Sequence, residues 1–279
     1  MSTATRSVLQ PADRAAYAED GYVIVRGFLN TEEVAALHDA ARSDTVIAEN
    51  SYELLDASGN TTRLALWYTP GDDVYGMLSR SNRMMDAVEA LLDGPAGHYH
   101  SKVMQKAPRT GGAWEWHQDY GYWYRNGFLF PDMLSVMIAL TPSVQSNGCL
   151  QVLPGSHRMG RINHGKIGEQ VGADQARVEA YQALRDVVYC EMQPGDALFF
   201  HSNLLHASGQ NTSDQPRWSI ISAYNLLTNR PISDEPAASC TTPVARVPDN
   251  ALLDVGASGV AATADFLKKE KRAYQEAKD

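Results

Sequence analysis

From residue 97 onwards, the sequence changes to a pattern of short strands separated by turns. The candidate strands are residues 97–106, 133–140, 148–153, 186–193, 196–201 and 217–226. Short strands at this spacing favour a β-sandwich or barrel over alternating βαβ units. We therefore predict a fold that is mainly β with flanking helices, built on a double-stranded β-helix core of the jelly-roll, cupin-like kind.

The residues before this region predict helices around a first strand. Pro at the start and Gly21 just past the end mark a helix over residues 11–20, and residues 22–29 follow as a strand. Asn30 and Glu33 are an N-cap and its capping-box partner for a helix that ends near residue 42. Residues 77–92 have the broad apolar face of one further helix. Residues 43–75 show little periodicity, and we interpret them as a mobile segment and candidate lid.

Two regions interrupt or extend the strands. Residues 159–183 are a polar insertion with helical character near its end. Residues 228–279 are an irregular C-terminal extension, whose last part, 262–279, predicts a charged surface helix. We expect a single domain over residues 1–279, with its core at about 21–227.

The chemistry of the chain is indicated by His117-Gln118-Asp119 and by a distant His206. In an extended segment, His117 and Asp119 point the same way, because strand side chains repeat every two residues. A His-x-Asp with a later His is the ligand set of a facial triad for Fe(II), which leaves coordination positions open for an organic co-substrate and O2. Arg217 begins the next strand and can hold a carboxylate through two parallel hydrogen bonds. Together these residues indicate an iron oxygenase that uses 2-oxoglutarate.

Charge and cysteine content restrict the partners and the compartment. The formal net charge is −9, which argues against a nucleic-acid partner. The first residues lack the apolar run of a signal peptide, and no stretch is long enough to span a membrane. Cys149, Cys190 and Cys240 are too few and too widely spaced for a disulfide framework. We expect a cytoplasmic protein, and its oligomeric state stays open between monomer and homodimer.

Several motifs occur in an order typical of one family. They are Trp116-His117-Gln118-Asp119, Asn147 to His157 (NGCLQVLPGSH), Pro194-Gly195-Asp196, His206-x-Ser208-x-x-Asn211 and Arg217. On these motifs the chain resembles the phytanoyl-CoA dioxygenase family of Fe(II)/2-oxoglutarate oxygenases, from Gly21 to about Leu227. Residues 106–120 look most like its proline and ectoine hydroxylase branch.

The resemblance implies a role for each matched position. Iron would be bound by His117, Asp119 and His206. The co-substrate 2-oxoglutarate would contact Arg217, Ser219, Ser208 and Lys102, and O2 is the second co-substrate, with ascorbate as a helpful reductant. Arg63 matches a position where relatives place a substrate or co-substrate contact. One departure is Met104, which stands where those relatives look to have a co-substrate-binding Asn, while Gln105 would face the other way.

The substrate is less constrained by the sequence than the metal site. An aromatic cluster flanks the metal motif and predicts either a substrate wall or ordinary core packing; its members are Trp114, Trp116, Tyr120, Tyr122, Trp123 and Tyr124. Arg125 and Asp132 follow it and would suit the two charges of a zwitterion. We therefore expect a small amino-acid-like or other small polar substrate, contacted by Arg63, Trp116, Tyr120, Trp123 and Arg125. An acyl-CoA would require a basic surface for its phosphates.

Two other functions stay open. The presence of Asp119 favours hydroxylation over chlorination, because halogenases on this scaffold lack the carboxylate ligand. Desaturation or cyclisation of an acyl-CoA or natural-product intermediate would use the same ligands. A non-oxygenase jelly roll, whether a binding module or a Zn- or Mn-dependent hydrolase or isomerase, would have no use for Arg217.

Overall fold

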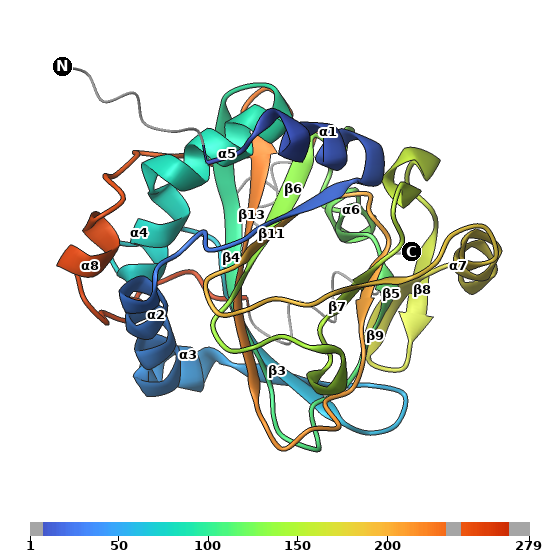
Figure 1. The fold of residues 1–279 in the computed structure, drawn as a ribbon, viewed down its shortest axis with the longest axis horizontal. Coiled ribbons are helices and arrows are strands. Elements are labelled where there is room, and N and C mark those ends of the chain that lie inside the picture. Colours follow the sequence, from blue (N-terminus) through green and yellow to red (C-terminus); the bar gives the residue numbers. More distant parts are fainter. Residues whose placement is uncertain (1–7, 233–240, 268–279) are drawn as a thin grey trace.

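The computed structural model contains two β-sheets, one large and one small, that face one another (Figure 1). It describes residues 8–232 and 241–267. The large sheet has eight strands in the order β1-β11-β6-β13-β4-β3-β2, with β14 also paired to β4. Its strands are β1 (Tyr22–Val25), β2 (Tyr52–Leu55), β3 (Thr61–Trp67), β4 (Ala96–Lys106), β6 (Met133–Ala139), β11 (Ala197–His201), β13 (Arg217–Leu226) and β14 (Thr242–Pro243). The small sheet has the order β10-β7-β12-β5 and comprises β5 (Trp114–His117), β7 (Leu150–Val152), β10 (Val188–Cys190) and β12 (His206–Ser208). All pairings in both sheets are antiparallel, as the jelly-roll prediction requires.

Helices cover the outer face of the large sheet (Figure 1). They are α1 (Pro11–Asp20), α2 (Thr31–Ser43), α3 (Thr45–Asn50), α4 (Val74–Arg80), α5 (Asn82–Leu92) and the short α8 (Ala251–Asp254). One apolar cluster, which includes Leu37, Val88 and Phe199, lies between these helices and the sheet. A second, which includes Met137, Val152 and Phe200, fills the space between the two sheets. The large sheet is therefore buried on both faces.

Most of the expected elements are present. Each of the six candidate strands from residue 97 onwards contains a strand. Helix α1 has the expected bounds and ends at Gly21, whose φ of 81° is left-handed. The capping box of α2 is complete, because Asn30 Oδ1 accepts from the Glu33 N–H and Glu33 Oε2 accepts from the Asn30 N–H. The first strand is shorter than expected and ends at Val25.

The prediction of a mobile segment at 43–75 was wrong. This segment contains α3, β2 and β3, and β3 pairs with β4 inside the large sheet. Leu64 and Leu66 face the space between the sheets, whereas Ala65 and Trp67 pack under the helices. A strand covered on both faces has no polar side, so the alternation that identifies a half-buried strand is missing.

Two other expectations need correction, and one was incomplete because it lacked a hairpin. Residues 77–92 form two helices, because the extended backbone of Ser81 separates α4 from α5 and its hydroxyl caps α5. The 159–183 insertion contains the hairpin β8 (His164–Ile167) and β9 (Gln170–Ala173) before the expected helix, α7 (Gln175–Gln182). Residues 262–267 are turns and an isolated bridge instead of a helix. The rest of the predicted C-terminal helix, 268–279, lies outside the described residues.

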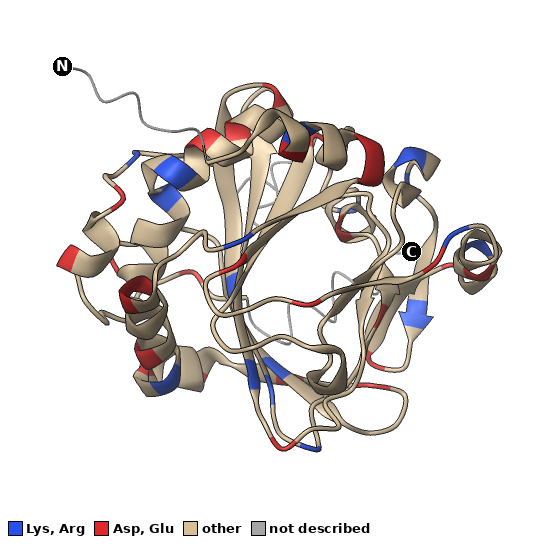
Figure 2. Cartoon of the chain, viewed as in Figure 1, with Lys and Arg blue, Asp and Glu red and all other residues tan. Residues whose placement is uncertain are grey.

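Charged side chains of both signs lie on the helices. Figure 2 shows Lys and Arg interspersed with Asp and Glu along the helices of this view. Among the described residues, no helix combines the length and apolar character needed to cross a bilayer. The structure also contains two short 3₁₀ helices, η1 (Gln145–Asn147) and η2 (Ser156–Met159).

Candidate metal and co-substrate site

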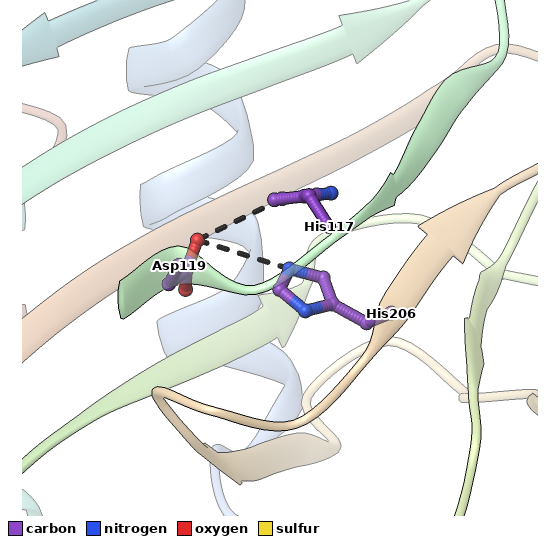
Figure 3. A group of neighbouring side chains, drawn as sticks. All are labelled: His117, Asp119 and His206. Carbon is purple, nitrogen blue, oxygen red and sulfur yellow. Dashed lines mark ion pairs between the residues drawn. The ribbon is translucent and has the colours of Figure 1, made fainter. Parts of the chain in front are cut away.

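Three side chains converge in the space between the two sheets. His117 ends β5, Asp119 begins the short helix α6 (Asp119–Trp123), and His206 begins β12. Asp119 Oδ1 lies 3.8 Å from the Nε2 atom of each histidine, and dashed lines mark these two contacts in Figure 3. One ligand atom from each of the three residues lies within 4.8 Å of the others, and all three residues are buried. Two imidazole nitrogens and one carboxylate oxygen at this spacing are the donor set of a facial triad for Fe(II).

Both histidines are held with Nε2 towards the centre of this triad. His117 Nδ1 lies 2.7 Å from the Glu115 carbonyl oxygen, and His206 Nδ1 lies 2.9 Å from the Leu204 carbonyl oxygen. A carbonyl only accepts, so each Nδ1 carries the proton and each Nε2 keeps a lone pair. This backbone contact also fixes the ring orientation, as is usual for metal-ligating histidines.

The protonation states also suit a metal. Burial lowers the pKa of His117 well below its usual range and lowers the pKa of His206, although Asp119 opposes the shift at His206. For Asp119, burial raises the pKa, but nearby His206 and Lys102 and the Ser135 hydrogen bond outweigh it and leave the pKa below its usual value. At neutral pH the site therefore holds two neutral imidazoles and a carboxylate, the forms that bind a divalent cation.

Ser135 on β6 orients the carboxylate. Its hydroxyl donates to Asp119 Oδ2 at 2.6 Å, which leaves Oδ1 directed at the two histidines. Ser135 is fully buried, and it comes from the large sheet while the histidines come from the small one. The hydrogen bond therefore ties the triad across the space between the sheets.

We expect Ser135→Ala to weaken Fe(II) binding by about 10- to 100-fold, because loss of a group that orients a metal ligand typically costs that much. Titration of the apoprotein with Fe(II) under anaerobic conditions measures the affinity. Ser79→Ala removes a buried hydroxyl on helix α4 and serves as the matched control. Equal affinities for the two variants would show that Ser135 does not position Asp119.

A bulge in β5 brings two ring side chains to the same side. His206 pairs with His117 and Ser208 pairs with Trp114, so three residues of β12 lie opposite four of β5. As a consequence Trp114 and His117 both line the pocket, although they are three residues apart. The sequence predicted that Asp119 lies in the same extended segment as His117. In the structure Asp119 begins α6 instead, and the extended backbone at Gln118 carries it to the triad.

Gln118, between the two ligands, points away from the metal position and anchors the turn. Its side-chain nitrogen donates to the carbonyls of Gly160 and Asn203, and its side-chain oxygen accepts from the Ile162 N–H, each at 2.8 Å. Gln118 is fully buried. Its amide thus holds the β5–α6 turn against two neighbouring loops.

Arg217 and Ser219 lie on the face of the large sheet that is turned towards the triad. In the β13–β4 register, Ser219 is opposite Met104 and Ile221 is opposite Lys102, which lines the pocket with His117 and Asp119. Arg217 is 2% exposed, and one guanidinium nitrogen donates to the Gly148 carbonyl. Its Nε and the Ser219 hydroxyl are buried without a hydrogen-bond partner among the described residues.

Unsatisfied buried donors indicate that a polar group from outside the chain completes this site. Burial lowers the pKa of Arg217 to about 10, so the guanidinium stays charged at neutral pH. Ser208, two residues after His206 on β12, is also buried and on the same face of that strand. A dicarboxylate that reaches from the triad to Arg217 fits this arrangement of donors.

A pocket of about 120 Å³ opens beside the triad. Its walls are mainly aromatic and aliphatic, with a few polar groups; its lining comprises Tyr52, Leu64, Leu66, Tyr68, Tyr99, His100, Lys102, Trp114, His117, Asp119, Tyr122, Trp123, Arg125, Asn126 and Leu267. Small-molecule sites commonly have this composition, with few polar groups that orient the ligand.

The structure brings some sequence-predicted substrate residues to this pocket and not others. Trp123 and Arg125 line it. Arg63 is opposite Gln105 on the other face of the sheet and donates to the Ala48 carbonyl, so the structure does not bring it to the site. Trp116 packs on the outer side of the small sheet, with Leu153 and Val178.

Tyr120 and Asp132 are also absent from the pocket lining. Tyr120 is buried in a separate cluster, and its hydroxyl donates to the Phe128 carbonyl. Asp132 is exposed. The zwitterion contact expected from Arg125 and Asp132 therefore does not form as a pair.

Sequence reasoning missed the pocket residues that come from β2, β3 and the start of β4. Tyr52, Leu64 and Leu66 belong to the segment that was interpreted as a lid, and Tyr99 and His100 belong to a strand whose inward face was not assigned. Side chains of a strand alternate between its two faces, so His100 lies on the same face as Lys102, two residues later. The sequence could therefore have identified His100 as a pocket residue.

Comparison with known proteins finds a family whose model matches most of the chain. The sequence model of the family described as phytanoyl-CoA dioxygenase (PhyH) matches residues 17–219. This range contains the triad, Arg217 and Ser219.

Individual relatives cover most of the chain. The L-proline trans-4-hydroxylase of Streptomyces griseoviridis is 29% identical over 232 residues, which are 77% of this chain and 86% of that protein. The ectoine dioxygenase of Halomonas elongata is 28% identical over 263 residues, 87% of this chain and 78% of that one. EctD from S. alaskensis shares the fold. Its structure with bound Fe gives a TM-score of 0.71 at 22% identity, and its structure with 2-oxoglutarate and 5-hydroxyectoine gives 0.67 at 21% identity. Each match covers 88% of this chain and 90% of EctD.

Proposed function

The chain belongs to the phytanoyl-CoA dioxygenase family, and from this we propose that it is a non-haem Fe(II)- and 2-oxoglutarate-dependent dioxygenase that hydroxylates an unactivated C–H bond of a small molecule. The observation that carries the proposal is the buried convergence of His117 Nε2, His206 Nε2 and Asp119 Oδ1. The names of the relatives support it, because they describe a proline hydroxylase and an ectoine dioxygenase.

Each part of the site has a place in this reaction. The iron, with 2-oxoglutarate and O2, supplies the oxidising power that converts the substrate C–H to C–OH while 2-oxoglutarate becomes succinate and CO2. His117, Asp119 and His206 would hold the metal, and Arg217 with Ser219 would hold the distal carboxylate of 2-oxoglutarate. Lys102 and Ser208 are further candidates for co-substrate contacts. Burial of the triad keeps bulk water away from the reacting atoms.

The substrate we propose is a small polar metabolite, with amino-acid-like molecules preferred. Trp123 and Arg125 line the pocket on the side of α6, and Trp114 and Tyr122 add aromatic wall. Aromatic walls favour a compact ring or aliphatic body, and the Arg125 guanidinium favours a carboxylate. Proline and ectoine, the molecules named in the relatives, are both of this size class.

We also propose the domain extent, the compartment and the partners of the enzyme. We place the whole chain, residues 1–279, in one domain that acts in the cytoplasm without nucleic-acid or membrane partners. Its net charge of −9 opposes binding to a polyanion. Cys149 and Cys190 are free thiols, as expected in a reducing compartment that also keeps iron ferrous.

Succinate formation tests the function directly. Anaerobically purified protein would receive Fe(II), ascorbate, 2-oxoglutarate and air, alone and with a panel of free amino acids, small cationic osmolytes and acyl-CoAs. We expect succinate to rise with one of the small polar compounds, and product mass to increase by one oxygen atom. A Zn- or Mn-dependent activity that needs no 2-oxoglutarate would contradict the proposal, and a loss of two hydrogens from the product would indicate desaturation or cyclisation.

A further inference from the structure

Lys106, the last residue of β4, is a buried lysine beside Arg217. The two residues are directly opposite one another in the β13–β4 register, so their side chains leave the same face of the sheet. Lys106 is 0% exposed. Its ammonium donates to the Gly209 carbonyl, while the Arg217 guanidinium donates to the Gly148 carbonyl. Carbonyl oxygens accept these hydrogen bonds but carry no full charge.

No acidic side chain of the described residues forms an ion pair with Lys106 or Arg217. Asp56 is the acid in electrostatic range of Lys106, but its carboxylate accepts from the backbone N–H groups of Ser58, Asn60 and Ala113. Burial raises the pKa of the neighbouring Cys149 thiol to about 11, so this group is neutral as well. Two basic groups thus share a buried volume, and the nearby Asp56 carboxylate forms an ion pair with neither of them.

An uncompensated buried charge is costly, and proteins pair such charges or bind an ion of the opposite sign. Burial and nearby Arg217 hold the pKa of Lys106 well below its usual range, and Asp56 opposes this shift without reversing it. Met104, one inward position before Lys106, offers no donor, and Ser219 opposite Met104 has an unpartnered hydroxyl. The unsatisfied donors and both cations therefore lie along one inward face.

We propose that Lys106 is a second cation for the distal carboxylate of 2-oxoglutarate, acting beside Arg217. The proposal rests on the function proposed above. It assigns to Lys106 the polar contact that Met104 does not supply, and it makes this end of the site selective for a dicarboxylic 2-oxo acid.

The test compares two co-substrate probes on the anaerobic Fe(II)-loaded protein by calorimetry. 2-Oxoglutarate carries the distal carboxylate, and 2-oxopentanoate has the same five-carbon chain without it. We expect Lys106→Met to raise the Kd for 2-oxoglutarate by about 10- to 100-fold, the usual loss for a hydrogen bond to a charged group, and to leave the Kd for 2-oxopentanoate unchanged. Lys166→Met, which removes an exposed lysine from β8, is the charge-matched control and should change neither value.

A second variant separates charge from folding. Lys106→Gln keeps a donor for the Gly209 carbonyl but no charge, and we expect the same selective loss of 2-oxoglutarate affinity. If both variants weaken the two probes equally, or neither of them weakens 2-oxoglutarate binding, Lys106 only ties β4 to the loop after β12 and the inference is wrong. If the unaltered protein binds 2-oxoglutarate no better than 2-oxopentanoate, the proposed function fails instead.

Discussion

Asp119→Ala is expected to lower turnover by about a thousandfold or more, because removal of one member of a catalytic unit typically abolishes most of its effect. The structural reason is that Asp119 Oδ1 lies 3.8 Å from both histidine Nε2 atoms and is the carboxylate of the three-residue group. Without it, two neutral imidazoles remain to hold a divalent cation. Succinate formation and Fe(II) affinity should therefore fall together.

A matched variant and a stability measurement make this result interpretable. Asp214→Ala removes an exposed carboxylate that pairs with Arg109, neither of which lines the pocket, and should keep full activity. Thermal unfolding of the apoprotein reports whether Asp119→Ala folds. A folded Asp119→Ala variant with normal iron binding and normal turnover would show that the triad is not the metal site.

Arg217→Met should raise the KM for 2-oxoglutarate by about 150- to 5000-fold, because loss of one partner from a buried charge pair typically costs about 3–5 kcal/mol. Arg217 is 2% exposed, and its Nε has no hydrogen-bond partner among the described residues, so the guanidinium is available for a carboxylate. Methionine keeps much of the side-chain volume but no donor. The effect should fall on 2-oxoglutarate and leave Fe(II) affinity near normal, since the triad lies on β5, α6 and β12.

Arg63→Met provides the control for Arg217. Arg63 also belongs to the large sheet, but it faces away from the site and donates to the Ala48 carbonyl. We expect this variant to retain the KM for 2-oxoglutarate. A rise in KM for Arg63→Met as large as that for Arg217→Met would mean that the effect comes from the sheet as a whole and not from a carboxylate contact.

The strands and the triad could be predicted because their signals are local. Residues 97–106 and 217–226 are preceded by prolines, Pro95 and Pro216, and both form strands of nearly the expected length. The residues His117, Asp119, His206 and Arg217 were selected by type and order, since iron ligation requires imidazole and carboxylate groups and a dicarboxylate requires a cation.

The errors arose where a residue's surroundings come from distant parts of the chain. Strand β3 is covered by helices on one face and by the small sheet on the other, so its sequence lacks the alternation of a half-buried strand. Trp116 and Tyr120 belong to the aromatic cluster beside the metal motif, yet the bulge in β5 and the start of α6 direct them away from the pocket. No local pattern contains that information.

The sequence by itself determined the ligand types, the strand-rich core and the family, because these depend on residue identity, order and local periodicity. Only the tertiary structure decided which side chains share a volume. It placed Ser135 against Asp119, Lys106 beside Arg217, and Arg63 on the far face. Strand register and the packing of two sheets set these neighbours, and register is a property of the paired strands that neither strand carries alone.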